Sequence, residues 1–187
     1  ANIFIPFAAI LLIITYCGII YHFSFFEAID YINLLGIAAF LFFSRTKKFA
    51  HYKYLGLPLL RIFTGLALFI LAFTEKLLFP YKALEFLEHY HLNFMKNLSI
   101  SVLDDQFFTL SAGSVEAALG IILIFGFITR INTIVLTGFF IASNIYFFVQ
   151  GYYPEGFTEL TGHLPIIATA IILIAYGSGH LRPSINP

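Results

Sequence analysis

Three ionisable side chains near the ends of long apolar runs are the residues of this sequence that could carry out chemistry. Glu75 closes one such run, Glu116 lies about two turns inside the next, and His163 lies near the start of the last. An ionisable group facing the interior of a membrane helix bundle is costly unless it is paired, and such groups often mark proton relays or binding sites. We therefore expect these three side chains to form the catalytic part of any site in this chain.

The sequence FTEKLLFP, residues 73–80, places Glu75 beside Lys76. Glu75 continues a series at helical spacing, namely Arg61, Gly65, Leu68 and Ala72. An α-helix puts such a series on one face, so Glu75 is predicted to face inward, at the rim of a polar pocket. Lys76 is rotated by about 100° from it. We interpret Lys76 as an anchor at the membrane surface and, with Asn144, as a candidate contact for a bound cofactor.

Glu116 lies in the sequence SAGSVEAALG, where it shares a helix face with Gly113 and Gly120. A carboxylate at this depth must be protonated, paired with a cation or bound to a ligand. One interpretation is therefore a functional carboxylate. The other is a buried ion pair, with Lys76 or a nearby arginine, that only fixes the register of the helices.

His163 lies in the sequence TELTGHLPIIATA. Thr158 or Thr161 can cap a helix that begins here, and Pro165 is tolerated in a first turn. The helix dipole then favours a neutral imidazole, which is the form that a metal ligand or a proton acceptor requires. A histidine at the end of a span can equally be a hydrogen-bonded residue of the membrane interface.

The sequence EHYH supplies the candidate metal ligands Glu88, His89 and His91. Two histidines and a carboxylate can hold a transition metal. However, residues two apart do not share a helix or strand face, and no HExxH spacing occurs. The pattern is a weak metal signal and leaves the presence of a metal open.

The composition sets the class of protein that must position these residues. The chain is 60% hydrophobic and only 11% charged, with a mean hydropathy of +0.91, whereas soluble domains carry about 25% charged residues. An integral membrane protein in contact with lipids is therefore predicted. The zero net charge provides no basic field for nucleic acid, and the single cysteine, Cys17, excludes an internal disulfide.

Six apolar runs are candidate membrane spans, which need about 20 residues each. They lie at about 3–22, 29–43, 57–79, 109–128, 132–149 and 160–177, and the second run is short. Lysine and arginine gather in the loop at 44–56, in the turn near Arg130 and in the C-terminal tail, which six spans would place on one side. The positive-inside rule then predicts that both termini are cytoplasmic.

We divide the chain into an N-terminal transmembrane hairpin with its basic loop, residues 1–56, and a helical core, residues 57–187. The segment 80–108 is predicted to contain an amphipathic helix that lies on the membrane surface over the outer mouth of this core.

Three stretches resemble the DoxX-like family of small four-helix bacterial and archaeal membrane proteins. They are LRIFTGLALFILAFTEKLLFP, EAALGIILIFGFITRINTIVL and GHLPIIATAIILIAYG, and the resemblance covers about residues 57–180. It implies a four-helix bundle in a prokaryotic cytoplasmic membrane, with Glu116 and His163 as polar site residues and Lys76 as a helix-end feature. It also implies a link to quinone-coupled sulfur oxidation, redox-stress complexes or membrane enzyme assembly.

Two functions follow as hypotheses. The chain is an accessory subunit of a redox-linked membrane complex, bound to other membrane subunits. Alternatively, it is a quinone-linked oxidoreductase subunit with its own site near Glu116 and His163. A channel is less favoured, because the polar cluster is confined to one side of the bundle.

Overall fold

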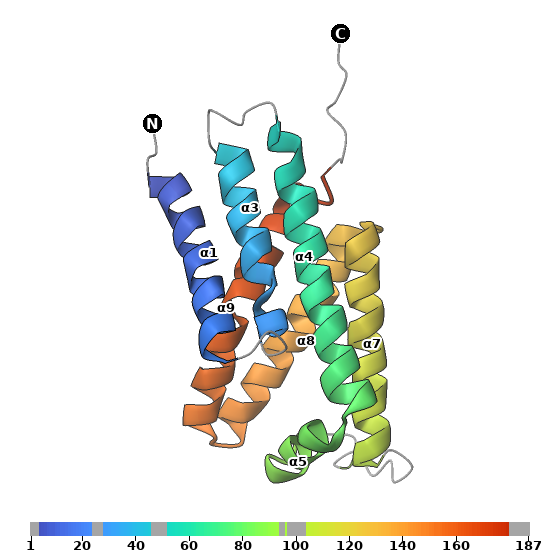
Figure 1. The fold of residues 1–187 in the computed structure, drawn as a ribbon. Helices are drawn as coiled ribbons and strands as arrows, with labels where there is room; N and C mark the ends of the chain where they lie inside the picture. The colour runs from blue at the N-terminus through green and yellow to red at the C-terminus, as the bar shows by residue number, and fades with distance from the viewer. Residues whose placement is uncertain (1–3, 24–27, 46–51, 94–95, 97–103, 180–187) are drawn as a thin grey trace.

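The chain folds as a bundle of helices in a computed structural model that describes residues 4–23, 28–45, 52–93, 96 and 104–179. The helices, shown in Figure 1, are α1 (Phe4–His22), η1 (Ile29–Tyr31), α3 (Asn33–Arg45), α4 (Gly56–Leu71), η3 (Ala72–Leu78), α5 (Tyr81–His89), α7 (Asp105–Phe125), α8 (Thr129–Val149) and α9 (Tyr153–Tyr176). No strand occurs in the described residues.

Five apolar helices are long enough to cross a membrane. They are Phe4–His22, Tyr52–Leu78, Asp105–Phe125, Thr129–Val149 and Tyr153–Tyr176, and a shorter apolar stretch covers Ile29–Ser44. The predicted all-α membrane fold is confirmed. The six predicted runs correspond to these five helices and the shorter one.

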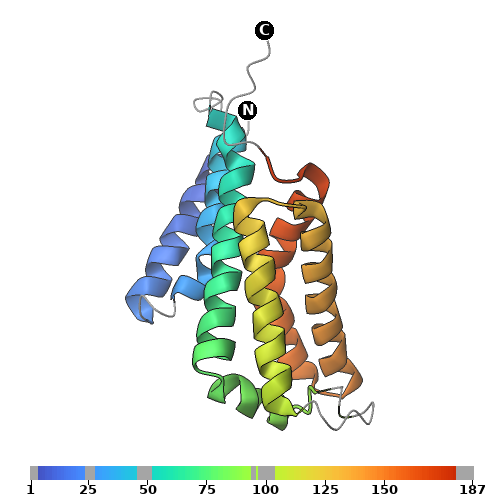
Figure 2. The same cartoon turned by 90° about the vertical axis from the view of Figure 1, so that its right-hand side faces the viewer.

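Helix α4 occupies the middle of the bundle, between α3 on one side and α7 on the other (Figures 1 and 2). Helices α8 and α9 pack against each other, and α9 also contacts α3 and α4. Helix α1 lies at the edge and packs mainly on α3. We call the end of the bundle that carries η3, α5 and the starts of α7 and α9 the α5 end. The opposite end carries the α7–α8 turn.

A leucine-rich core joins α4, α7, α8 and α9. Its buried members are Leu60, Leu68, Leu123, Leu136, Phe140 and Leu173. Large apolar side chains also cover the outside of the bundle, for example Ile134, Val135 and Ile145 on α8. In water such a surface would drive aggregation, whereas lipid chains solvate it.

Helices α4 and α7 approach so closely at Gly65 and Gly120 that no side chain fits between them. A Cβ atom on Gly65 would lie 2.7 Å from the Gly120 carbonyl oxygen, and one on Gly120 would lie 2.8 Å from the Gly65 carbonyl oxygen. Small residues at this crossing thus let the two helices approach closely.

Arg61 fixes the same two helices at the end opposite α5. Its buried guanidinium donates from Nη1 to the carbonyl oxygens of Leu123 (2.6 Å) and Ile124 (2.7 Å). These carbonyls belong to the last turn of α7, where the helix itself supplies no N–H groups to bond to them. The negative end of the helix dipole also lies there. Gly126 follows with φ of +82°, and a Cβ atom there would collide with the guanidinium.

Two helices begin earlier than the sequence predicts. α7 begins at Asp105, where the Asp104 carboxylate caps it by accepting from the Phe107 amide at 2.7 Å. α9 begins at Tyr153, with Pro154 in its first turn, so the predicted start near residue 160 is wrong. The helix accommodates the polar sequence TELTG, since its threonine hydroxyls donate to carbonyls of the preceding turn.

Candidate functional site

The π-helix η3 decides which charge of the FTEKLLFP stretch faces the bundle. Its hydrogen bonds span five residues, as in the bond from the Phe79 amide to the Thr74 carbonyl oxygen (3.0 Å). A turn therefore contains more residues than in an α-helix, and the inward position after Ala72 falls at Lys76 instead of Glu75. Glu75 is exposed. The predictions that Glu75 faces inward and that Lys76 is a surface anchor are both wrong for this reason.

Lys76 forms an ion pair with Glu116. Its Nζ lies 2.6 Å from Oε1 and 2.7 Å from Oε2, so both carboxylate oxygens are engaged. The Glu116 side chain is 6% exposed and that of Lys76 is 27% exposed. Gly113 makes the approach possible, since a Cβ atom there would lie 2.6 Å from the Lys76 Cβ. The ion-pair interpretation of Glu116 thus describes its geometry.

Asn144 of α8 holds His163 of α9. The Asn144 Nδ2 donates to the Phe140 carbonyl oxygen (2.8 Å) and lies 3.3 Å from the His163 Nδ1. Because a carbonyl oxygen accepts only from a donor, the Phe140 carbonyl fixes which end of the amide faces it. The second Nδ2 hydrogen then points to Nδ1, which must be the unprotonated ring nitrogen. His163 is therefore set as the Nε2–H tautomer.

His163 does not lie at a helix N-terminus. It lies about three turns into α9, and Pro165 is inside the helix rather than in its first turn. The dipole argument for a neutral imidazole is therefore wrong. The ring is instead neutral in this geometry because Asn144 donates to it, and it packs against the Phe140 ring at 4.6 Å between centroids.

Charged groups of three helices gather at the α5 end. His163 interacts electrostatically with Glu116 and Lys76, and Glu159 interacts with Glu75 and Lys76. Glu159 is not among the site residues predicted from the sequence. It lies four residues before His163 on the same face of α9, a signal that the late predicted start of this helix concealed.

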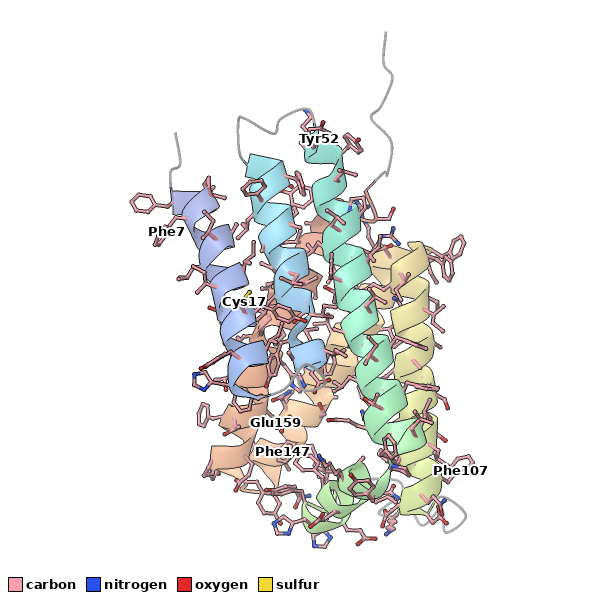
Figure 3. All side chains as sticks on the ribbon, viewed as in Figure 1. Phe7, Cys17, Tyr52, Phe107, Phe147 and Glu159 are labelled. Carbon is pink, nitrogen blue, oxygen red and sulfur yellow. The ribbon has the colours of Figure 1, made fainter. Side chains whose placement is uncertain are left out.

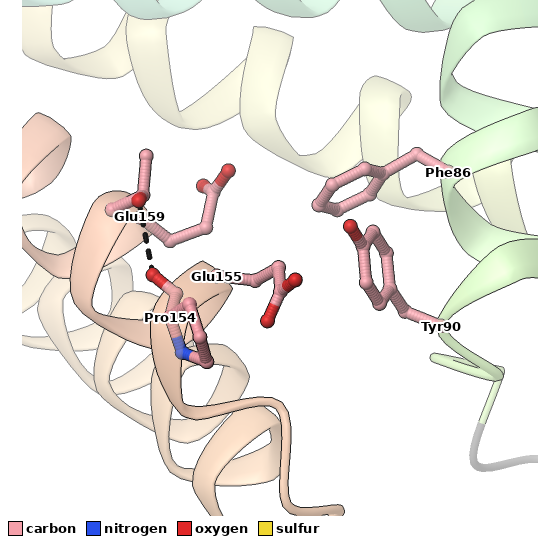
Figure 4. A pocket seen from close by; sticks show the side chains of 6 residues that line it. Phe86, Tyr90, Pro154, Glu155 and Glu159 are labelled. Carbon is pink, nitrogen blue, oxygen red and sulfur yellow. Dashed lines mark hydrogen bonds between the residues drawn. The ribbon is translucent and has the colours of Figure 1, made fainter.

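A cavity of about 230 Å³ opens beside this cluster, between α5 and the first turns of α9 (Figure 4). The carboxylates of Glu155 and Glu159 point into it from α9, opposite the rings of Phe86 and Tyr90 on α5. Within the described part of the chain, neither carboxylate has a salt-bridge partner. Figure 3 labels Glu159 and Phe147 near this end of the bundle.

The EHYH sequence attaches α5 to the bundle. The His89 ring packs edge-on against Tyr90 at 4.6 Å, and the His91 carbonyl oxygen accepts from the Tyr146 hydroxyl at 2.7 Å. Glu88 is exposed. Across the described residues, no three histidine, cysteine or acidic side chains come together as a metal site would require.

Membrane-length apolar helices that enclose a buried ion pair define this chain as an all-α integral membrane protein. A family model described as DoxX matches residues 56–151, from the start of α4 through α8, and the chain belongs to this family. No curated protein and no solved structure matches the chain. The family match ends before α9, so Glu116 and Asn144 lie within it and His163 lies outside it.

Proposed function

We propose that this DoxX-family protein is an accessory subunit of a redox-linked membrane complex. The observation that carries the proposal is the Lys76–Glu116 ion pair. A catalytic carboxylate must be free to exchange a proton with its substrate, whereas both oxygens of Glu116 are engaged by Lys76 in a nearly buried position. The redox link itself rests on family membership.

The pair also has a clear structural task. It joins η3 to α7 at the α5 end, as Arg61 joins α4 to α7 at the opposite end. Between the two lies the close glycine contact of Gly65 and Gly120. Among the described residues, the two buried charged side chains, Arg61 and Glu116, thus both fix the position of one helix pair, as expected of a structural subunit.

The outward face of α8 supports a partner subunit. Gly138 and Ala142 are exposed, one helical turn apart, between apolar side chains. A Cβ atom on Gly138 would have no neighbour within 4 Å. Small residues on a lipid-facing surface let the helix of another subunit approach closely.

Gentle purification followed by mass spectrometry of the bound proteins tests the proposal. Wild type, Glu116→Gln and Ala168→Leu, which enlarges an exposed residue on α9, are expected to retain the same partner protein. Gly138→Leu is expected to lose it while remaining folded by circular dichroism. A wild-type protein that purifies without any partner, or a partner retained by Gly138→Leu, would contradict the proposal.

A second candidate function, a quinone-linked site, is favoured by His163 and by the cavity that Glu159 lines, about one helical turn before His163. With Nδ1 held by Asn144, Nε2–H remains as a donor for a quinone oxygen. Glu159, with no salt-bridge partner in the described residues, lines this cavity and could accept or supply a proton. Reduction of a quinone consumes two electrons and two protons, and the electrons would have to come from a partner subunit.

The second candidate is tested by measuring quinone in the purified protein. Quinone present in wild type and in Glu85→Gln, an exposed glutamate of α5, but lost in His163→Ala and Glu159→Gln, would support a site on this chain. Equal quinone in all four proteins would show that it is carried by the surrounding lipid.

A further inference from the structure

We propose a binding site for a phosphate group at the end of the bundle opposite α5. It is a cavity of about 650 Å³ between the α7–α8 turn, the start of α8 and the residues that follow α9. This volume lies within the range of about 300–1,000 Å³ that is usual for ligand sites. The cavity is separate from the candidate site at the α5 end.

Arg130 supplies a positive charge to the cavity wall. It donates from Nη2 to the Ala175 carbonyl oxygen at 3.2 Å, which uses one of its five N–H groups. No carboxylate pairs with it among the described residues. The remaining donors form a planar fork that matches two oxygens of a phosphate.

The surrounding charge favours an anion. No acidic residue occurs in α8, in α7 beyond Glu116 or in α9 beyond Glu159. Arg61 lies near this end of α4 and is positively charged. In these parts of the described helices, no acidic side chain is present to neutralise Arg130.

The start of α8 lacks a cap. Its N-cap residue, Ile128, has φ of 39° and no side-chain hydrogen bond to the helix, so the first amide groups have no partner from a cap. Thr129 lines the cavity, is 4% exposed, and its Oγ1 has no hydrogen-bond partner in the described structure. An unsatisfied buried hydroxyl is unfavourable. A phosphate oxygen would satisfy such donors, as it does at other helix N-termini.

Backbone from two turns forms the rest of the wall. Gly126 (φ +82°), Gly177 (φ +77°) and Gly179 (φ +66°) all line the cavity in left-handed conformations that favour glycine. A Cβ atom on Gly126 would meet the Arg61 guanidinium and one on Gly179 would meet Pro58, so these glycines let the cavity wall pack closely on α4. Ser178 adds a hydroxyl to the lining.

The rim indicates a lipid as one source of the phosphate. Ile128 and Ile131 line the cavity beside Arg130 and are 63% and 61% exposed. Apolar side chains next to a guanidinium suit a headgroup phosphate whose acyl chains lie in the bilayer. Free phosphate shares the same chemistry and is separated from lipid by the experiment.

The test is native mass spectrometry of the full chain, stripped of lipid in detergent and titrated with phosphatidylglycerol. Wild type is expected to bind one lipid, Arg130→Gln to bind it about tenfold more weakly, and Arg130→Lys to lie between them. The matched control Lys53→Gln removes one positive charge at the same end and is expected to bind as wild type does. Circular dichroism confirms that each variant is folded.

Two results would overturn the proposal: equal binding by Arg130→Gln and wild type, or an equal loss in Lys53→Gln, which would mean diffuse attraction without a site. Inorganic phosphate is added in a second arm. Displacement of the lipid by phosphate would show that the site accepts the free ion, and persistence of the lipid would assign the site to the headgroup.

Discussion

Removal of Lys76 is expected to destabilise the protein more than removal of Glu116, although the two form one ion pair. Lys76→Met leaves Glu116 unpaired in a position where its side chain is 6% exposed. Glu116→Gln leaves Lys76, whose side chain is 27% exposed and can turn its ammonium group toward water. The glutamine oxygen can also still accept one hydrogen bond from Nζ.

The magnitudes follow from burial. Breaking a buried pair costs about 3–5 kcal/mol, and we expect about 3 kcal/mol for Lys76→Met because the pair is partly exposed on the Lys76 side. For Glu116→Gln we expect about 1 to 2 kcal/mol, since the ammonium group that remains is partly hydrated. The double variant leaves no unpaired charge and should lose less than the sum, with a coupling of about 1–3 kcal/mol.

The assay is equilibrium unfolding in mixed micelles of dodecylmaltoside with increasing SDS, followed by far-ultraviolet circular dichroism. The chain has no tryptophan and its one cysteine is exposed on α1, so neither an intrinsic tryptophan signal nor a thiol probe would report on the core. A double variant whose loss equals the sum of the two single losses would refute the ion pair. So would a larger loss from Glu116→Gln than from Lys76→Met.

Three further predictions concern the helix contacts. Gly65→Ala should lower the free energy of unfolding by about 1–3 kcal/mol, because its Cβ would meet the backbone of α7. Gly138→Ala, whose Cβ would meet no other atom, should raise it by about 0.5 kcal/mol in the same assay. Equal effects of the two substitutions would contradict the close crossing. Arg61→Met should lower the free energy of unfolding by about 2–3 kcal/mol and speed hydrogen exchange of the amides after the last turn of α7. Unchanged exchange would show that the guanidinium does not cap α7. Nitrogen NMR should find His163 Nδ1 unprotonated in wild type and both tautomers in Asn144→Leu; a protonated Nδ1 in wild type would refute the assigned hydrogen bond.

Much of the fold could be predicted from the sequence because lipid imposes one strong rule. A span must be helical and apolar over about 20 residues, and five of the predicted runs correspond to helices of that length. The start of α9 could not be placed in this way. The run TELTG reads as a loop by polarity, but threonine hydroxyls can bond to the preceding turn, and Pro154 starts the helix earlier.

The members of the candidate site were partly predictable. Glu116, His163 and Asn144 stand out as polar groups in apolar helices, and the structure brings Asn144 and His163 into contact. The partner of Glu116 could not be chosen from the sequence, because the inward position depends on whether residues 72–78 wind as an α- or a π-helix. A single extra residue per turn exchanges the places of Glu75 and Lys76.

The polar atoms that remain without partners indicate where ligands should be sought. The charges of Lys76, Glu116 and Arg61 Nη1 are all used to hold α4 and η3 to α7, so they need no further explanation. In the described residues, six buried side-chain polar atoms have no hydrogen-bond partner, namely Arg61 Nε, Thr109 Oγ1, Thr129 Oγ1, Asn132 Oδ1, Asn144 Oδ1 and Thr169 Oγ1. Because unsatisfied buried groups are rare in native proteins, the two that lie beside a proposed site, Asn144 Oδ1 and Thr129 Oγ1, favour an additional binding partner there. Asn144 contacts His163, and Thr129 lines the same cavity as Arg130, so the two proposed sites lie at opposite ends of the bundle.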